Sequence, residues 1–169
     1  GPGGFRVSAS EHGTFFIRPA AAVTIPQNVP PSPGENFVRV ENILVNGVTT
    51  EDQIPGLSAA QRAMAYQYSD GAGRSMQIVN VKGSPSGYDV VHPEAYNTHG
   101  RQPLANLPYV ATDANGSIKS SPLTNQASFY NGTFAVANDD RPFQESEFEM
   151  SPLNRVGKVY GAGELWKNS

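Results

Sequence analysis

The segment QASFYNGTFAVAN, from Gln126 to Asn138, constrains the fold of this chain more than any other, because two apolar runs flank the dipeptide Asn131-Gly132. Asn-Gly is the pair best suited to a two-residue type I′ turn, in which both central residues need a positive φ. The segment therefore predicts a β-hairpin centred on residues 131 and 132. It specifies no chemistry.

The composition favours the same class of fold. Among 169 residues there are 17 glycines and 14 prolines, and charged residues make up only 16% of the chain, against about 25% in typical globular domains. Such a chain is typical of short strands joined by many turns. We expect a mainly β protein, a single-domain antiparallel sandwich or barrel with one short helix and long loops.

The domain organisation follows from the ends and from one proline-rich stretch. Gly1-Pro2 is typical of a protease-cleavage scar, so residues 1–4 are predicted to be an expression scar or flexible N-terminus. Residues 5–169 are predicted to form one β-rich domain. Within it, residues 26–34 (PQNVPPSPG) hold four prolines and cannot form a ladder of hydrogen bonds. We expect an extended surface connector that contacts another subunit or domain.

Alternation of apolar and polar residues predicts the remaining strands. The expected strands are Phe5–Ser10, Thr14–Ile17, Ala20–Ile25, Asn36–Val45, Ser75–Val81, Tyr88–Val91, Tyr109–Thr112, Phe143–Met150 and Val156–Tyr160. The first two are expected to form a hairpin. The one expected helix is Ser58–Tyr68, because Ser58 and Gln61 have the spacing of a capping box. Residues 92–108 are expected to form a long loop.

Charge and cysteine content exclude several classes of function. The net charge is −3 and the Lys and Arg residues are scattered, which argues against a nucleic-acid partner, because phosphates favour clustered basic residues. The absence of cysteine excludes thiolate catalysis and Cys-based zinc sites. No apolar run reaches the ~18 residues of a membrane-spanning helix, so we expect no membrane span.

A metal site is one candidate function. His92, Glu94 and His99 are close in sequence, with Asp89 just before them, in or beside the expected long loop. Neutral imidazole and carboxylate are suitable ligands for zinc or another divalent ion. The alternative interpretation is a solvated polar loop that binds no metal, and the sequence favours that reading.

A second candidate is a binding surface formed by Tyr88, Tyr96, Tyr109 and Tyr130. Asparagines are interleaved with these tyrosines, and the two residue types together provide flat contact area and hydrogen bonds at low entropic cost. Such a surface suits a protein partner or a saccharide receptor. The alternative is that they are ordinary half-buried strand tyrosines.

A third candidate is catalytic. Arg6 in an N-terminal strand, the strand 109–112, and Glu145-x-Glu147 resemble the three-part signature of mono-ADP-ribosyltransferase toxins, although Ala111 stands where the family has a serine. The resemblance implies NAD as cofactor, with Arg6 holding the dinucleotide and Glu145 and Glu147 as the catalytic acids. A carboxylate there stabilises the developing positive charge of the sugar. The alternative is a solvated acidic face on a strand.

The opening segment GGFRVSASEHGTFFIRPAAAVTI resembles the start of small accessory proteins of tailed-phage tail tips and fibres. This resemblance implies a non-catalytic structural or binding module without a cofactor, forming an oligomer or contacting a protein, in a virion or secreted. We take this as the leading interpretation. A secreted toxin domain with ADP-ribosyltransferase activity is the alternative.

Overall fold

The structure is a computed structural model that describes residues 5–9, 15–19, 32–58, 60–131 and 137–167, with only the backbone described in the first two ranges. The chain divides into two compact units. Unit 1 contains Gly1–Val90 and Ala111–Ile118, and unit 2 contains Val91–Val110 and Lys119–Ser169. The described residues are mainly β with one short α-helix, so the predicted fold class is confirmed.

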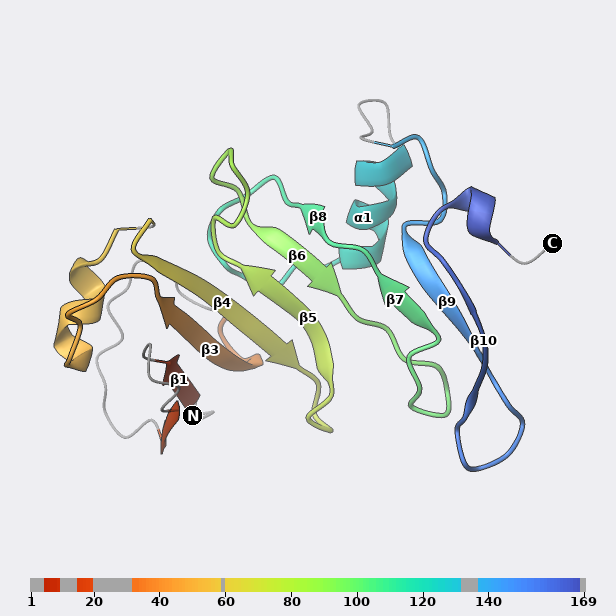
Figure 1. Cartoon of the computed structure of the whole chain (residues 1–169), viewed down its shortest axis with the longest axis horizontal. Helices are drawn as coiled ribbons and strands as arrows, with labels where there is room; N and C mark the ends of the chain where they lie inside the picture. The colour runs from red at the N-terminus through yellow and green to blue at the C-terminus, as the bar shows by residue number, and fades with distance from the viewer. Residues whose placement is uncertain (1–4, 10–14, 20–31, 59, 132–136, 168–169) are drawn as a thin grey trace. The chain divides into compact units, whose positions relative to one another are not determined.

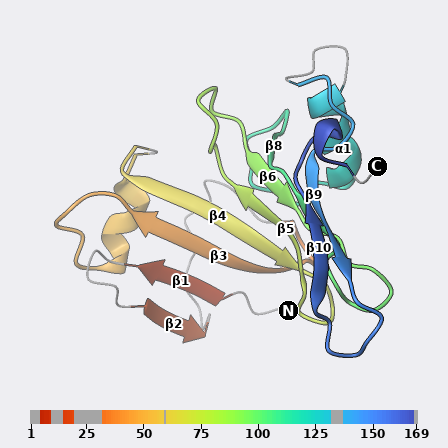
Figure 2. The same cartoon turned by 45° about the vertical axis from the view of Figure 1, so that its right-hand side comes forward.

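Unit 1 is built on five strands in the order β2-β1-β3-β4-β5 (Figures 1 and 2). Their bounds, with that of a 3-10 helix, are β1 Phe5–Ala9, β2 Phe15–Pro19, β3 Asn36–Ile43, η1 Glu51–Gly56, β4 Arg62–Ser69 and β5 Ser75–Asn80. The antiparallel pairing of β1 with β2 confirms the predicted first hairpin. One pair departs from the expected antiparallel pattern, because β1 and β3 are parallel.

One face of the unit 1 sheet forms its buried core. The register places Arg39 opposite Tyr66, and Tyr66 opposite Val79, so the three side chains share a face. Neighbouring positions on that face are also buried; they are Glu41, Tyr68 and Gln77. The rings of Tyr66 and Tyr68 lie 6.1 Å apart. The core is therefore aromatic and partly charged rather than aliphatic.

The predicted helix over Ser58–Tyr68 is wrong, because residues 62–69 form β4. The local signal exists in part: the Ser58 N–H donates to the Gln61 side-chain oxygen at 3.0 Å, and the Gln61 N–H donates to the Ser58 carbonyl. These bonds close a turn instead of starting a helix. After it, β4 pairs with β3 and β5 on its two sides, and pairing on both sides outweighs weak helix propensity.

Unit 2 contains a three-stranded antiparallel sheet in the order β10-β9-β7, and β8 beside β6 (Figure 1). The bounds are β6 Val90–Pro93, β7 Leu104–Asn106, β8 Tyr109–Val110, α1 Pro122–Asn131, β9 Phe143–Phe148, β10 Val156–Tyr160 and a 3-10 helix, η2, Glu164–Trp166. The strands predicted at residues 143–150 and 156–160 are confirmed. The expected loop over residues 92–108 contains the short strand β7.

The predicted hairpin at Asn131-Gly132 is wrong, because Asn131 is the last residue of α1; Gly132 lies outside the described residues. The helix begins at Ser121-Pro122, where the Asn125 N–H donates to the Ser121 carbonyl at 3.0 Å. Proline is favoured at the first helical position, since its fixed φ suits the helix and its missing N–H would have no partner there. The sequence therefore carries a local signal for the start of this helix.

Several predictions fall on residues outside the described ranges. These are the scar at residues 1–4, the strand Ala20–Ile25 and residues 26–31 of the proline-rich connector. Ser32, near the end of the connector, is described, and its hydroxyl oxygen accepts the Ile118 N–H at 3.0 Å. The single folding domain over residues 5–169 stays a prediction. No helix in the described part of the chain has the length and apolar character needed to cross a bilayer.

Candidate functional site

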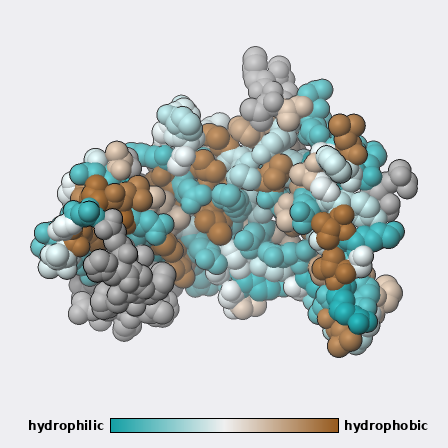
Figure 3. Space-filling view, viewed as in Figure 1, coloured by the Kyte–Doolittle hydropathy of each residue, from teal (hydrophilic) through white to brown (hydrophobic). Residues whose placement is uncertain are grey.

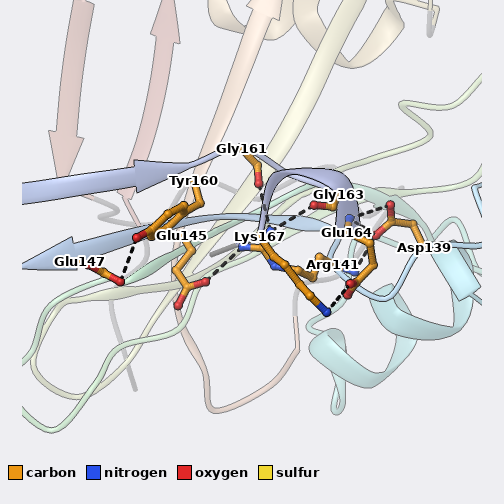
Figure 4. A network of polar contacts seen from close by, with 9 residues as sticks. All are labelled: Asp139, Arg141, Glu145, Glu147, Tyr160, Gly161, Gly163, Glu164 and Lys167. Atoms are coloured by element: carbon orange, nitrogen blue, oxygen red, sulfur yellow. Dashed lines mark hydrogen bonds and ion pairs between the residues drawn. The ribbon is translucent and has the colours of Figure 1, made fainter. Parts of the chain in front are cut away.

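The two acids of the proposed catalytic signature lie on β9, and each of them contacts a neighbouring polar side chain. Glu145 Oε2 lies 3.1 Å from Arg141 Nη2. Glu147 accepts a hydrogen bond from the Tyr160 hydroxyl at 3.1 Å, and its other oxygen lies 3.8 Å from Lys158 Nζ. Figure 4 shows the contact of Glu145 with Arg141 and that of Glu147 with Tyr160. Both acids therefore help to hold the C-terminal hairpin together.

Arg141 is the centre of this network (Figure 4). It is buried, and its guanidinium carbon lies 5.1 Å from the centre of the Phe143 ring. Its Nη1 donates to the carbonyl oxygens of Gly161 and Gly163 at 3.4 and 3.1 Å. One side chain thus holds the loop between β10 and η2 and also pairs with Glu145.

Asp139 fixes the same loop from the other end. Its carboxylate accepts the N–H of Arg141 at 2.8 Å and the N–H of Glu164 at 3.1 and 3.2 Å. Gly163 has φ of +100°, a conformation that residues with a Cβ rarely adopt. A Cβ there would lie 3.2 Å from the Asp139 carboxylate. The loop is therefore held in one arrangement by Asp139 and Arg141 together.

The short helix η2, which follows this fixed loop, carries two exposed hydrophobic side chains. Leu165 is 97% exposed and Trp166 is 66% exposed. The Trp166 ring lies over the backbone of Gly161, where an added Cβ would approach the ring at 3.3 Å. Tryptophan is among the residues most enriched at protein-binding hot spots. The short helix η2 thus presents the large apolar side chain of Trp166 in a defined position.

A bulge in β10 gives the strand two chemically different faces. The register shifts between Val156 and Lys158, so Val156 lies opposite Phe148 while Val159 lies opposite Ser146. Positions 148 and 146 share a face of β9, since side chains alternate along a strand. The two valines therefore lie on one face, although they are three positions apart in the chain. Lys158 lies on the other face, opposite Glu147.

The outer edge of β10 has no neighbouring strand within the described sheet. Ser146 donates its N–H to the Pro103 carbonyl at 2.8 Å, on the side of β7. In an antiparallel sheet the N–H and C=O of one residue point to the same side, and the direction alternates along the strand. Val159 lies opposite Ser146, so its N–H and C=O point away from β9 to the free edge.

Exposed hydrophobic residues gather on these same segments. Figure 3 shows brown, hydrophobic patches at the surface over the hairpin and the segment after it. The exposed hydrophobic residues are Met150, Leu153, Val156, Val159, Leu165 and Trp166. We call these six residues, with the free edge of β10, the hairpin surface. Contiguous exposed apolar residues mark interaction sites more often than isolated ones do.

The candidate metal ligands do not converge. Among the described residues, no three His, Cys, Asp or Glu side chains lie close enough together to hold a metal ion. Glu94 accepts from Gln102 Nε2 at 3.0 Å and from the Tyr96 hydroxyl at 3.4 Å. The His99 N–H donates to Asn97, within a turn. His92, Glu94 and His99 are therefore not brought together as ligands.

The four tyrosines do not form the single surface that the sequence suggested. Tyr109 is 2% exposed, so it cannot contribute to a surface, and its ring lies 6.5 Å from that of Phe129. The Tyr130 hydroxyl donates to the Pro108 carbonyl at 2.7 Å. Both side chains pack α1 against the segment around β8. A binding role for Tyr88 and Tyr96 stays a prediction.

Arg6 belongs to unit 1, and its side chain lies outside the described part of the structure.

A charged cluster that the sequence did not single out lies in the same unit. Arg39 contacts Glu41, and Arg62 Nη1 lies 3.7 Å from the other carboxylate oxygen of Glu41. Burial raises the pKa of the neighbouring Tyr66; the charge of Glu41 also raises it, while the arginines lower it. Because Arg62 also donates to the Ile54 carbonyl at 3.3 Å, the cluster holds η1 on the sheet.

Sequence reasoning missed the residues that form the hairpin surface. The strand at residues 156–160 is predictable from alternation, but the bulge that places Val156 and Val159 on one face is not. Arg141 has no sequence signal, since its partners at residues 161 and 163 are distant in the chain. The nearest signal in the sequence is the chain's one tryptophan, which follows closely after two glycines, Gly161 and Gly163.

Comparisons with known proteins give one result. No curated protein and no solved structure matches the chain. A family model described as a domain of unknown function, DUF6443, matches residues 41–169. The match covers most of the chain and includes the whole hairpin surface. The chain belongs to the DUF6443 family.

Proposed function

We propose that this chain is a non-catalytic binding module that binds a protein partner through the hairpin surface. The observation that carries the proposal is the exposure of Leu165 and Trp166 in η2, directly after a loop held by the buried Arg141. Exposing large apolar side chains to water is unfavourable, and fixing them gives no benefit to an isolated fold. Both features favour binding, because a preorganised anchor loses less entropy when a partner closes over it.

A protein partner fits this surface better than a saccharide does. Saccharide sites need hydrogen-bonding groups beside aromatic rings, whereas the hairpin surface consists of aliphatic side chains and one tryptophan. Apolar residues with a central aromatic anchor and a charged rim are typical of protein interfaces. Three ion pairs lie on the same segments as the apolar residues; they are Arg155–Glu149, Lys158–Glu147 and Lys167–Glu164. A structural role in a virion or a secreted assembly is consistent with such a module.

A displayed library of random peptides tests the proposal. We expect selection on the wild-type chain to yield peptides whose binding falls at least tenfold in the double variant Leu165→Ser, Trp166→Ala. Met76→Ala is the matched control, because Met76 is an exposed hydrophobic residue in unit 1, and it should leave binding unchanged. Peptides that bind all three proteins equally, or a library that yields no binder, would overturn the proposal.

A further inference from the structure

We infer that the partner binds as an added β-strand along the free edge of β10, and that it is an extended segment in which apolar and acidic side chains alternate. This inference rests on the proposed function and names the chemistry of the partner. Three observations carry it: the direction of the Val159 backbone groups, the two faces created by the bulge, and the sign of the outermost charges.

The backbone geometry supports strand addition. Val159 directs its N–H and C=O away from β9, as the Ser146–Pro103 bond requires. An unpaired edge of this kind is a template for another strand, and natural proteins usually protect such edges. Lys158 is the one charged side chain within β10. A lysine and a bulge both protect an edge against indiscriminate pairing, so only a strand that matches Lys158 is expected to pair here.

The two faces of β10 define what the added strand must carry. On one face, its side chains would lie beside Val156 and Val159, so apolar residues are favoured there. On the other face, its side chains would lie beside Lys158, and an opposite charge directly across a strand pair is stabilising. Because side chains alternate along a strand, a segment that satisfies both faces alternates apolar and acidic residues.

The charges around the edge favour an acidic partner over a basic one. In each of three ion pairs the cation is more exposed than its acid: 70% against 27% for Arg155–Glu149, 65% against 43% for Lys158–Glu147, and 59% against 41% for Lys167–Glu164. The outermost charges along β10 and beyond it are therefore positive. A second copy of the chain is disfavoured, since β10 pairing with itself about Lys158 would bring like charges together.

The test uses seven-residue peptides with blocked termini, measured by fluorescence anisotropy on the full chain. We expect a peptide that alternates valine and glutamate to bind at least tenfold more tightly than the same peptide with lysine in place of glutamate. N-methylation of the central amides of the first peptide should abolish binding, because it removes the edge hydrogen bonds. Equal binding of the glutamate and lysine peptides, or no binding of either, would overturn the inference.

Two variants connect binding to the edge. Val159→Pro removes an N–H that points to the free edge and leaves the ladder with β9 intact, so we expect at least a tenfold loss of binding with an unchanged circular dichroism spectrum. Val159→Thr is its control, because threonine keeps the N–H and the branched shape, and it should retain most of the binding. Lys158→Glu should reverse the preference toward the lysine peptide, and it keeps the inference testable even if Val159→Pro fails to fold.

The outcomes separate this inference from the proposed function. Library peptides that depend on Leu165 and Trp166, but bind Val159→Pro as well as the wild type, would overturn strand addition and leave the proposed function standing. Sedimentation equilibrium that shows a dimer disrupted by Val159→Pro would assign the edge to a second copy, and would overturn the acidic partner. The inference would be supported if Val159→Pro no longer binds the valine–glutamate peptide and Lys158→Glu binds the lysine peptide more tightly than the glutamate peptide.

Discussion

Arg141 Nη1 donates a hydrogen bond of 3.1 Å to the carbonyl oxygen of Gly163. This bond connects the segment just before β9 to the loop that follows β10. The same guanidinium pairs with Glu145 and lies over the ring of Phe143. A buried arginine with several acceptors is strongly bound to its place, since moving the side chain would break several hydrogen bonds at once. Arg141 therefore determines where Leu165 and Trp166 lie.

Arg141→Ala is expected to lower the free energy of unfolding by roughly 2–4 kcal/mol, because it removes the Arg141 bonds to the Gly161 carbonyl and to Glu145 and one of the two donors to the Gly163 carbonyl. Urea denaturation measures this change. Arg155→Ala is the matched control: Arg155 pairs with Glu149 at the surface, and exposed pairs add little stability. The denaturation midpoint of that variant should stay close to the wild-type value; equal midpoints for the two variants would contradict the role of Arg141.

Asp89→Asn is expected to destabilise unit 1 by about 2–4 kcal/mol. Asp89 is fully buried, and its carboxylate accepts the Lys82 N–H at 3.0 Å and the Gly116 N–H at 2.7 Å. An amide in place of the carboxylate loses a charge-assisted bond and places an NH2 group against a backbone donor. Asp52→Asn, at an exposed position, is the control. A thermal melting temperature that falls equally in both variants would refute the prediction.

Tyr68 makes stability depend on pH in the alkaline range. Burial raises the pKa of its phenol from 10 to about 12, and the hydroxyl donates to the Gly116 carbonyl at 2.6 Å. Because the folded pKa is above the unfolded value, the contribution is complete below pH 10 and is lost as the pH rises toward 12. Unfolding midpoints measured from pH 9 to 12 should fall less steeply in Tyr68→Phe than in the wild type. Parallel curves would disprove this.

Glu149 makes the tip of the C-terminal hairpin sensitive to acid. The Arg155 side chain, followed by the Ser151 hydroxyl, donates hydrogen bonds that hold the pKa of Glu149 below its ordinary value. Because the folded pKa is depressed, the stabilising effect is present above the unfolded pKa and is lost as the pH falls through the folded one. A carboxyl-carbon NMR titration should show Glu149 protonating at a lower pH in the wild type than in Arg155→Ala. An identical titration in both proteins would show that Arg155 does not act on Glu149.

Gln126→Leu tests the packing of α1. Gln126 is buried, and its Nε2 donates to the Leu107 carbonyl at 2.6 Å and to the Pro142 carbonyl at 3.0 Å. Removing this donor takes away the Gln126 bond to the Leu107 carbonyl and one of the two donors to the Pro142 carbonyl, which keeps the Leu107 N–H, so we expect a loss of about 1–3 kcal/mol by guanidinium denaturation. Asn125→Ala, on the exposed side of the helix, should change stability much less. A stable Gln126→Leu variant would show that the helix is held by its aromatic contacts alone.

The sequence alone determined the fold class and most of the strands. Alternating residues predict β3, β5, β9 and β10, and the first hairpin follows from two short alternating runs around a turn. These predictions succeed because a strand with one buried face must alternate, and that requirement is local.

Two segments were assigned wrongly because their local signals fit more than one structure. The Ser58–Gln61 bonds form as the sequence suggests, yet the chain then enters β4, since β3 and β5 supply partners on both sides. Asn131-Gly132 suits a type I′ turn, but the same pair is typical of a helix end. Contacts of Gln126 and Phe129 with distant residues favour the helix there.

The candidate site was determined by tertiary structure. The sequence supplied Glu145 and Glu147 as a pair of acids on a strand, but Lys158 and Tyr160, the partners of Glu147, become its neighbours only when β9 and β10 pair. Likewise, no pattern in the sequence says that Val156 and Val159 share a face. The bulge at Gly157 places them there, and a bulge depends on the pairing of two strands rather than on the residues of one.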